Sequence, residues 1–241
     1  MITNINYTEN KAIEAKYQQL ERLGADLGVP VPRTLLQLEA FDGNGNLIHA
    51  HRQRSHSWNR NFYNWMMSQM ATLNLDSGTF GPSNLNLKDT AGTTQTTTMA
   101  FIIHCNVSDA TRGLRGESGD DNHGIIVGSG TLAENFEHYS LQSKITNGTG
   151  AGQLSYIEQE PYARSYDPVS KTYSSAMARY FNNNSGASVS INETGLVVRD
   201  IKVQTASLRV MVCRDVLVST ITLPDTGQLK VTYTIELVYP D

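Results

Sequence analysis

The chain has 241 residues, of which 39% are hydrophobic and 17% are charged, and its formal net charge is −4 at pH 7. This length allows one large β domain, or a domain of about 200 residues with an N-terminal appendage. Abundant Asn, Ser, Thr and Gly favour short strands with polar loops over layers of helices. The charge gives no overall attraction to nucleic acid or an acidic membrane, so neither is an expected partner.

The start of the chain lacks the basic and apolar regions of a secretory signal, and nowhere do 18 apolar residues run together. We therefore expect a protein made in a cytoplasm. Cys105 and Cys213 each lie in an apolar, strand-like run, and we expect two buried thiols rather than a disulfide.

Residues 9–25 have the pattern of an amphipathic helix, in which Ile13, Tyr17, Leu20 and Leu27 recur at three-, four- and seven-residue steps. Glycines and prolines follow it, so residues 1–33 form a predicted helical arm ahead of a β-sandwich domain at 34–241. Two interpretations stay open at this stage. The helix packs on its own domain, or its apolar stripe docks on a neighbouring subunit.

Residues 34–41 and 46–53 flank Asp42-Gly43-Asn44-Gly45, which predicts a β-hairpin because glycine allows the positive φ of such turns. A basic stretch follows. It is made of His49, His51, Arg52, Arg54, His56 and Arg60. No third metal ligand is evident, so we expect a solvated or subunit-facing basic surface rather than zinc, and phosphate contact has no support from the overall charge.

A second helix is predicted at residues 57–75, inserted in the β domain and capped by Ser57. Its broad apolar stripe consists of Trp58, Phe62, Trp65, Met66, Met70 and Leu73. Aromatic and methionine residues at this spacing are typical of core, so we expect this helix to plug the β structure. The alternative is an oligomer interface.

A loop is predicted at 76–95, a strand at 96–107 and a polar loop at 108–123. Asp120, Asp121 and His123 lie close together there, but without the spacing of a calcium loop. Residues 124–130 read as a buried strand before a glycine turn, and no Gly-Lys-Ser/Thr follows that would indicate nucleotide binding.

Further strands are predicted at 139–145 and 154–161, followed by a loop at 161–171 whose nearby tyrosines, Tyr162, Tyr166 and Tyr173, could bind a ligand through their rings. A hairpin is predicted between 171–182 and 187–198, with a bulge at Gly195 where the apolar parity changes. A strand at 208–218 comes next.

The last strand, residues 228–239, has an unbroken period-two pattern, and the Pro-Asp-Thr-Gly turn before it predicts a hairpin or a sheet edge. Together these patterns predict a mainly β protein. Its architecture is expected to be an antiparallel β-sandwich of Greek-key or jelly-roll type with two N-terminal helices.

The order of motifs is similar to that of a group of tailed-bacteriophage virion proteins. The similar motifs are Ser-Trp-x-Arg-Asn-Phe at 57–62, Gly-Ile-Ile-Val-Gly-Ser-Gly at 124–130, Tyr-x-Leu at 139–141, Gly-x-Gly-x-Gly-Gln-Leu-Ser-Tyr at 148–156, and the runs 178–186, 191–196, 214–217 and 228–235. The resemblance covers about residues 50–239. Its motifs are turns and strand edges, and it carries no active site.

The resemblance implies a homo-oligomeric structural subunit of a phage virion, made in the bacterial host cytoplasm, with copies of itself and other virion proteins as partners and no cofactor. We expect the neck or tail as its position. The candidate interface residues are Ile13, Tyr17, Leu20, Arg52, Arg54 and Arg60. The alternative is a capsid decoration or host-glycan-binding module that uses the tyrosines. A hydrolase with Glu158 and Glu160, or Asp120 and Asp121, is not expected.

Overall fold

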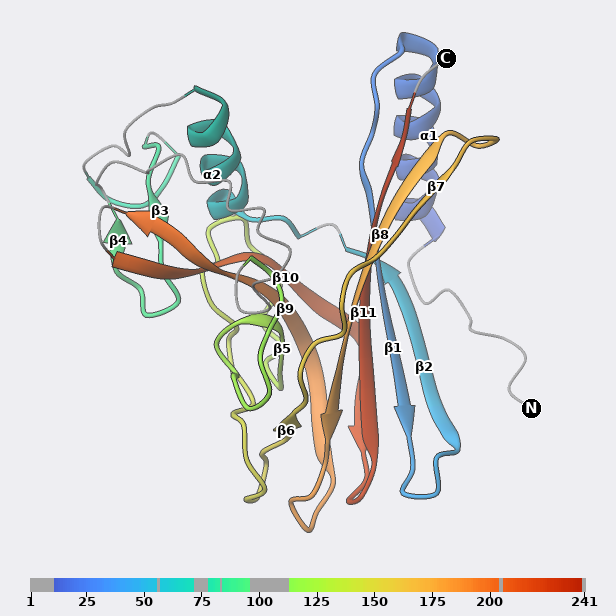
Figure 1. The fold of residues 1–241 in the computed structure, drawn as a ribbon, viewed down its shortest axis with the longest axis vertical. Coiled ribbons are helices and arrows are strands. Elements are labelled where there is room, and N and C mark those ends of the chain that lie inside the picture. The colour runs from blue at the N-terminus through green and yellow to red at the C-terminus, as the bar shows by residue number, and fades with distance from the viewer. Residues whose placement is uncertain are drawn as a thin grey trace.

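The computed structural model describes residues 11–55, 57–71, 78–82, 84–95, 113–203 and 206–239. Two antiparallel sheets face each other, and two helices lie on different arms of the resulting V shape (Figure 1). The predicted β-sandwich with two N-terminal helices is confirmed, and the Greek-key or jelly-roll type stays a prediction. None of the helices in the described ranges has the length and apolar character needed to cross a membrane.

The larger sheet has the strand order β2–β1–β11–β8–β6, and β7 also pairs with β8. The smaller sheet has the order β10–β9–β5, and β3 and β4 form a separate two-stranded sheet. The strands are β1 (Arg33–Phe41), β2 (Leu47–Arg54), β3 (Leu87–Lys88), β4 (Thr94–Gln95), β5 (Gly124–Gly128), β6 (Ser155–Tyr156), β7 (Ala163–Asp167), β8 (Thr172–Asn182), β9 (Val189–Val203), β10 (Ala206–Leu223) and β11 (Gln228–Val238).

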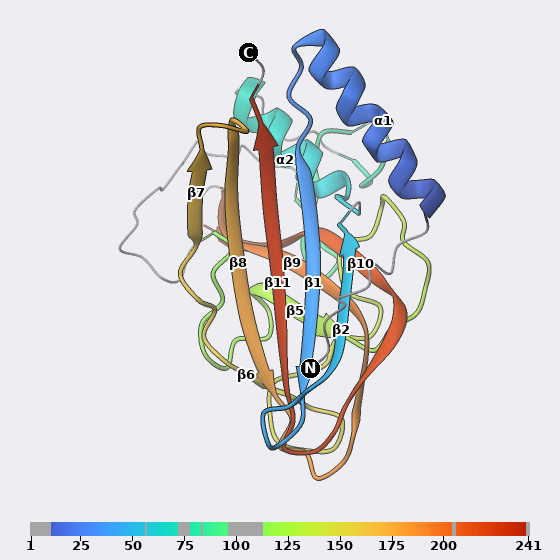
Figure 2. The same ribbon diagram turned by 90° about the vertical axis from the view of Figure 1, so that its right-hand side faces the viewer.

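Strand β11 lies between β1 and β8, at the centre of the larger sheet (Figure 2). Its inward side chains Leu229, Val231 and Tyr233 are fully buried, which confirms the period-two pattern. The expected hairpin or edge position is wrong, because the turn after Leu223 carries the chain from β10 in the smaller sheet to β11 in the larger one. A turn motif specifies a reversal of direction, and that reversal can join two facing sheets as well as two neighbouring strands.

The same correction applies to the predicted hairpin between 171–182 and 187–198. Strand β8 belongs to the larger sheet and β9 to the smaller one, so the turn at 183–188 also links the two layers. Both inter-sheet turns lie at the bottom of Figure 1, where the sheets come together. The hairpin of β1 and β2 is confirmed, and Gly45 in its turn has a φ of 81°.

The loop between β5 and β8 differs from its prediction. Residues 139–145 form no strand and make only an isolated bridge from Lys144 to Gly128. The expected strand at 154–161 is reduced to β6, whereas the expected loop at 161–171 contains β7, which forms a hairpin with β8. The polar composition of residues 161–171 does not exclude a short strand there, because an exposed strand at the edge of a sheet needs no buried side chains.

Gly195 is not the site of a bulge, since β9 pairs with β5 without a shift through this residue and the shifts toward β10 lie elsewhere. Its role is close packing. A Cβ atom at this position would lie 3.1 Å from both the Cys213 carbonyl oxygen and Leu141 Cδ2. The predicted strand at 96–107, which includes Cys105, lies outside the described residues, and Cys213 is a buried free thiol.

Helix α2 (Arg60–Ala71) is capped by Asn59 rather than by Ser57. The Asn59 Oδ1 atom accepts a hydrogen bond of 3.2 Å from the Phe62 amide. Ser57 is unsuitable because the chain is still extended there, with a bridge between Trp58 and Cys213. The predicted cap was therefore two residues early.

The apolar stripe of α2 is divided. Trp58, Phe62 and Trp65 pack against the core, as predicted, but Met66 and Met70 are exposed, and Leu73 lies outside the described residues. The side of the helix that faces the body is also held by asparagines: Asn61 Nδ2 donates to the Met211 and Lys88 carbonyl oxygens, and Asn64 Nδ2 donates to the Asn86 carbonyl oxygen. These amide contacts fix which side faces the body, and the methionines turn outward.

Arg179 on β8 points into the sandwich and is fully buried. Its guanidinium donates five hydrogen bonds of 2.6–2.9 Å, all to main-chain carbonyl oxygens, those of Glu117, Asp120, His123, Ile125 and Ile157. All five N–H donors are thus used. Burial lowers its pKa to about 10. One side chain therefore holds the loop at 117–123 and strand β5 against the larger sheet.

A second buried network fastens the loop at 130–143 to the smaller sheet. Glu193 accepts hydrogen bonds from the amides of Gly130, Gln142 and Ser143 and from Arg214 Nε at 2.7 Å. Arg214 in turn contacts His138 Nδ1 and the Leu132 carbonyl oxygen. Both charged side chains are at most 2% exposed, and the Glu193 carboxylate oxygens accept from four defined N–H donors.

The two sheets also meet through a buried polar cluster around Asp215. Its Oδ2 atom accepts hydrogen bonds from Ser55, Cys213 and Tyr233, and the Tyr233 hydroxyl also contacts Thr194 Oγ1 at 2.7 Å. The Oδ1 atom has no hydrogen-bond partner among the described residues. Burial, followed by the charge of Glu134, raises the pKa of Asp215.

The raised pKa predicts a pH effect on stability. The folded state retains the Asp215 proton to a higher pH than the unfolded state. The contribution of this proton to the free energy of unfolding is therefore complete at acidic pH, and it is lost as the pH rises above the ordinary aspartate range. Asp215→Asn should remove it. We expect urea unfolding to show the variant gaining stability relative to the parent as pH rises, by up to about 1.4 kcal/mol per pH unit. A gap that is constant with pH would contradict this account.

Candidate functional site

Helix α1 (Lys11–Leu27) lies outside the larger sheet, beside β1 and β2 (Figure 2). Arg54 on β2 holds it there. Its guanidinium binds both Glu14 carboxylate oxygens, at 2.6 and 2.9 Å, and one Glu21 oxygen at 2.7 Å. It also lies 4.9 Å from the centre of the Tyr17 ring. The hydrogen bonds that Arg54 donates to Glu14 raise the pKa of Arg54, so this clamp stays charged.

The clamp directs the polar and aromatic side of α1 toward the body, and the apolar side outward. The exposed side chains are Ile13, Leu20, Leu23 and Leu27, from 37% to 68% exposed. We call these four residues the α1 apolar face. A globular surface helix normally shows the reverse arrangement, with its apolar stripe on the core.

The structure therefore separates the candidate interface residues of α1. Ile13 and Leu20 lie on the exposed face, whereas Tyr17 lies in the clamp with Arg54. The prediction missed Leu23, although the spacing of 13, 20, 23 and 27 follows positions a and d of a heptad. Position 16, the remaining d position, is an exposed lysine.

The basic stretch does not form one surface. Arg54 is in the clamp, and Arg60 binds the Glu137 carboxylate at 2.6–2.9 Å and lies over the Phe136 ring. His51 is buried and its Nε2 contacts Gln53 Oε1 at 2.7 Å, while burial lowers its pKa. Arg52 is half-buried on β2, and His56 lies outside the described residues. The side chains of His51, Arg54 and Arg60 therefore face different partners within the chain.

A pocket of about 550 Å³ lies between α1 and the turn of the β7–β8 hairpin. Its walls carry charges of both signs, including Arg22, Lys171 and Glu236, together with apolar atoms of Val29 and Tyr239. Glu236 is paired with Arg33, which also lines the pocket. The mixture gives no strong preference for one ligand chemistry.

The three candidate tyrosines do not share one platform. Tyr162 is half-buried against the core, its hydroxyl accepts a hydrogen bond from the Leu114 amide, and burial raises its pKa. Tyr166 and Tyr173 are directly opposite each other on β7 and β8. The Tyr166 ring also makes an edge contact with Tyr239, with 6.4 Å between the ring centres.

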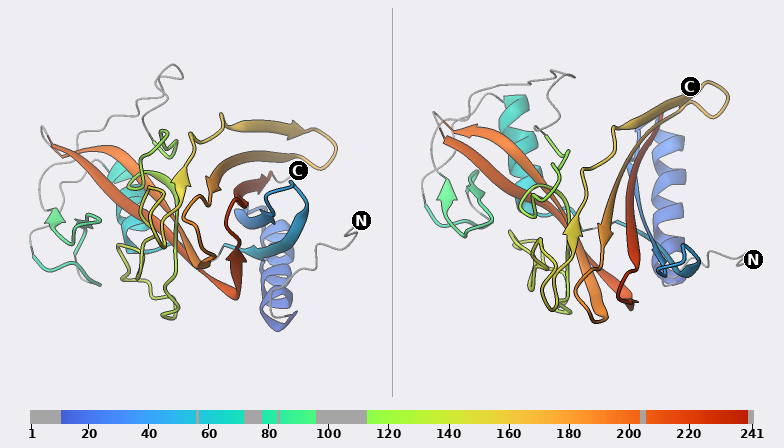
Figure 3. Two further views of the ribbon diagram at one scale, coloured as in Figure 1. Left: turned by 90° about the horizontal axis from the view of Figure 1, so that it is seen from below. Right: turned by 60° about the horizontal axis from the view of Figure 1, so that its bottom comes forward.

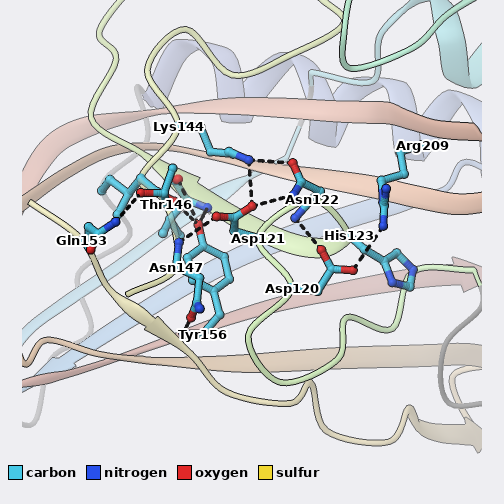
Figure 4. A network of polar contacts seen from close by, with 12 residues as sticks. Asp120, Asp121, Asn122, His123, Lys144, Thr146, Asn147, Gln153, Tyr156 and Arg209 are labelled. Atoms are coloured by element: carbon cyan, nitrogen blue, oxygen red, sulfur yellow. Dashed lines mark hydrogen bonds and ion pairs between the residues drawn. The ribbon is translucent and has the colours of Figure 1, made fainter. Parts of the chain in front are cut away.

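The acidic loop at 120–123 forms a polar network with the strands and loops beside it (Figure 4). Asp121 binds Lys144 Nζ at 2.8 Å and the Asn147 amide at 2.7 Å. Partial burial alone would raise the pKa of Asp121, but these hydrogen bonds outweigh it and the pKa is lowered. Asp120 lies 3.8 Å from Arg209, so both carboxylates are neutralised within the chain.

This arrangement suits a structural junction better than acid–base chemistry. Asp121 is held ionised, and Glu158 forms an ion pair of 3.0 Å with Arg115. The part of the chain that the structure describes contains no group of three His, Cys, Asp or Glu side chains placed to hold a metal ion.

A scan of protein-family models, a search of curated proteins and a search of solved structures each returned no match.

A second exposed face lies on α2. It consists of Tyr63, Met66, Met67 and Met70, with Phe136 of the neighbouring loop 5.7 Å from the Tyr63 ring. These five side chains are 37–67% exposed, and we call them the α2 methionine face. The i, i+3, i+4, i+7 spacing of its four helix residues was visible in the sequence. What the sequence did not show is that the asparagine contacts turn this side away from the core.

Proposed function

We propose that this chain is a homo-oligomeric structural subunit of a tailed-phage virion, positioned at the neck or tail. The observation that carries the oligomer is the α1 apolar face, which the Arg54 clamp holds outward. The phage assignment rests on the resemblance of motifs between residues 50 and 239. The proposal assigns the chain no catalytic step and no cofactor.

The energetics favour a partner for this face. Four half-exposed aliphatic side chains present about 350 Å² of apolar surface, and covering it contributes about 9 kcal/mol before the cost of association. Isolated exposed leucines are ordinary on a monomer, but four in one row form a patch of the size that marks an interaction site. Strand β2 is the outermost strand on one side of the larger sheet, which makes it the candidate for strand-edge contacts between copies.

A capsid decoration or host-glycan-binding module is the second candidate. Its support is the contact of Tyr166 with Tyr239 at the rim of the pocket beside α1, since exposed aromatic rings stack on sugars. Because Tyr162 packs against the core, fewer exposed aromatic rings are available for sugar binding than the sequence suggested.

The proposal predicts that Ile13→Ser with Leu20→Ser weakens self-association. Losing two half-exposed aliphatic contacts should cost about 2 kcal/mol, which is about a thirty-fold rise in the dissociation constant. Light scattering of purified protein over a dilution series measures it. The same variant should be depleted from purified phage particles, where gold-labelled antibody should mark the neck or tail.

Gln19→Ser is the matched control, because Gln19 is exposed on the same helix but outside the apolar face. It should assemble like the parent. A parent protein that stays monomeric at all concentrations and decorates the capsid surface or binds host glycans would replace the proposal with the second candidate.

A further inference from the structure

We propose that the α1 apolar face of one copy docks on the α2 methionine face of the next copy. This inference rests on the proposed function, because it names the partner surface through which the subunit assembles. It also gives the α2 methionine face a role.

The two faces lie on different arms of the molecule. Helix α1 lies outside the larger sheet, and α2 packs against β10 of the smaller one, in all the views (Figures 1 and 3). One chain therefore carries two separate exposed helix faces, joined by the two sheets. A contact between two different faces can repeat from one copy to the next. It produces a closed ring when the rotation that relates neighbouring copies adds up to a full turn.

The apolar areas of the two faces are of the same order as the nonpolar area on one side of a stable contact. Their exposed fractions correspond to about 350 Å² of apolar surface on α1 and about 500 Å² on α2, whereas one side of a standard interface contributes roughly 450 Å² of nonpolar area. Methionine side chains are flexible and polarizable, so the α2 face can adapt to the branched side chains of Ile13, Leu20 and Leu23.

Charge distinguishes this pairing from contact between two α1 helices. Lys16 lies in line with the α1 apolar face and is exposed, with no ion pair in the described part of the chain. Two packed α1 helices would place this cation against leucine or against its own copy, which is unfavourable. The border of the α2 methionine face carries two acids and one arginine instead. Glu137 is paired with Arg60, and Glu134 accepts a hydrogen bond from the Val216 amide. Among the residues that the structure describes, this border therefore presents no uncompensated cation to Lys16.

Mixing of single-face variants tests the inference. Leu20→Glu with Leu23→Glu removes the α1 face, and Met66→Glu with Met67→Glu removes the α2 face. Each variant alone should be monomeric. An equimolar mixture should form a species of twice the monomer mass and no larger one, because one intact face of each kind remains. Val169→Glu, at an exposed position outside both faces, should leave the parent assembly unchanged.

Sedimentation and light scattering give the masses, and circular dichroism with thermal unfolding shows that each variant is folded. Serine replacements at the same positions serve if a glutamate variant does not fold. An α2-face variant that assembles like the parent would show that α1 pairs with itself, and would overturn the inference. So would an α1-face variant that still assembles, or a mixture that stays monomeric. A parent that is itself monomeric would instead contradict the proposed function.

Discussion

Replacing Arg179 with methionine is expected to lower the free energy of unfolding by about 4 kcal/mol. The fully buried guanidinium donates to five main-chain carbonyl oxygens from the loop at 117–123, β5 and residue 157. Methionine fills much of the volume but donates nothing, so these acceptors lose their buried partner. Denaturant unfolding followed by circular dichroism measures the loss.

Two further variants make this result specific. Arg179→Lys keeps a cation with three donors and should retain part of the stability, because it cannot reach all five carbonyl oxygens. Arg164→Met removes an arginine from the exposed strand β7 and should change stability by less than about 0.5 kcal/mol. An Arg179→Met protein within about 1 kcal/mol of the parent would mean that water or a shifted loop satisfies the carbonyl groups.

Replacing Glu193 with glutamine is expected to cost about 3 kcal/mol of stability. The carboxylate accepts from three backbone amides and from Arg214 Nε. Glutamine keeps the shape but substitutes an NH₂ group for one acceptor oxygen, and it leaves the buried arginine without an anion. Hydrogen exchange should also increase at residues 130–143, since Glu193 fastens this loop to the smaller sheet.

A double-mutant cycle separates the pair from its surroundings. Arg214→Met alone should also destabilise, because it leaves a buried carboxylate without its cation, while the double variant should cost at least about 1 kcal/mol less than the sum. Glu158→Gln breaks the more exposed ion pair with Arg115 and should change stability by less than about 1 kcal/mol. Additive effects at Glu193 and Arg214 would show that the amide contacts, rather than the ion pair, stabilise the loop.

Local patterns in the sequence were sufficient for several elements. The alternation in β11, the Asp-Gly-Asn-Gly turn between β1 and β2, the buried strand β5 and both helices could all be predicted. These features depend on neighbours within a few residues, where φ preferences and side-chain periodicity act directly. The same periodicity indicated Ile13 and Leu20 as one face of a helix, although not whether that face was buried.

The sheet assignment needed the tertiary structure. The turns after Asn182 and Leu223 look like hairpin turns in sequence, but each one joins the two layers. The sequence does indicate that Arg179 faces the core, since it shares the alternation of Met177 and Phe181 along β8. The five carbonyl oxygens that accept its hydrogen bonds belong to segments more than twenty residues away, so no local sequence pattern could predict them.

The orientation of both helices on the body is also set by tertiary contacts. The sequence by itself determined that α1 and α2 are amphipathic, because a 3.6-residue period can be counted along the chain. Which side faces the body depends on distant partners: Arg54 for α1, and the carbonyl oxygens of Met211, Lys88 and Asn86 for α2. A buried cation or amide that finds such partners outweighs the burial of a few apolar side chains, because an unpaired polar group inside a protein is costly. The two apolar faces are left outward for that reason.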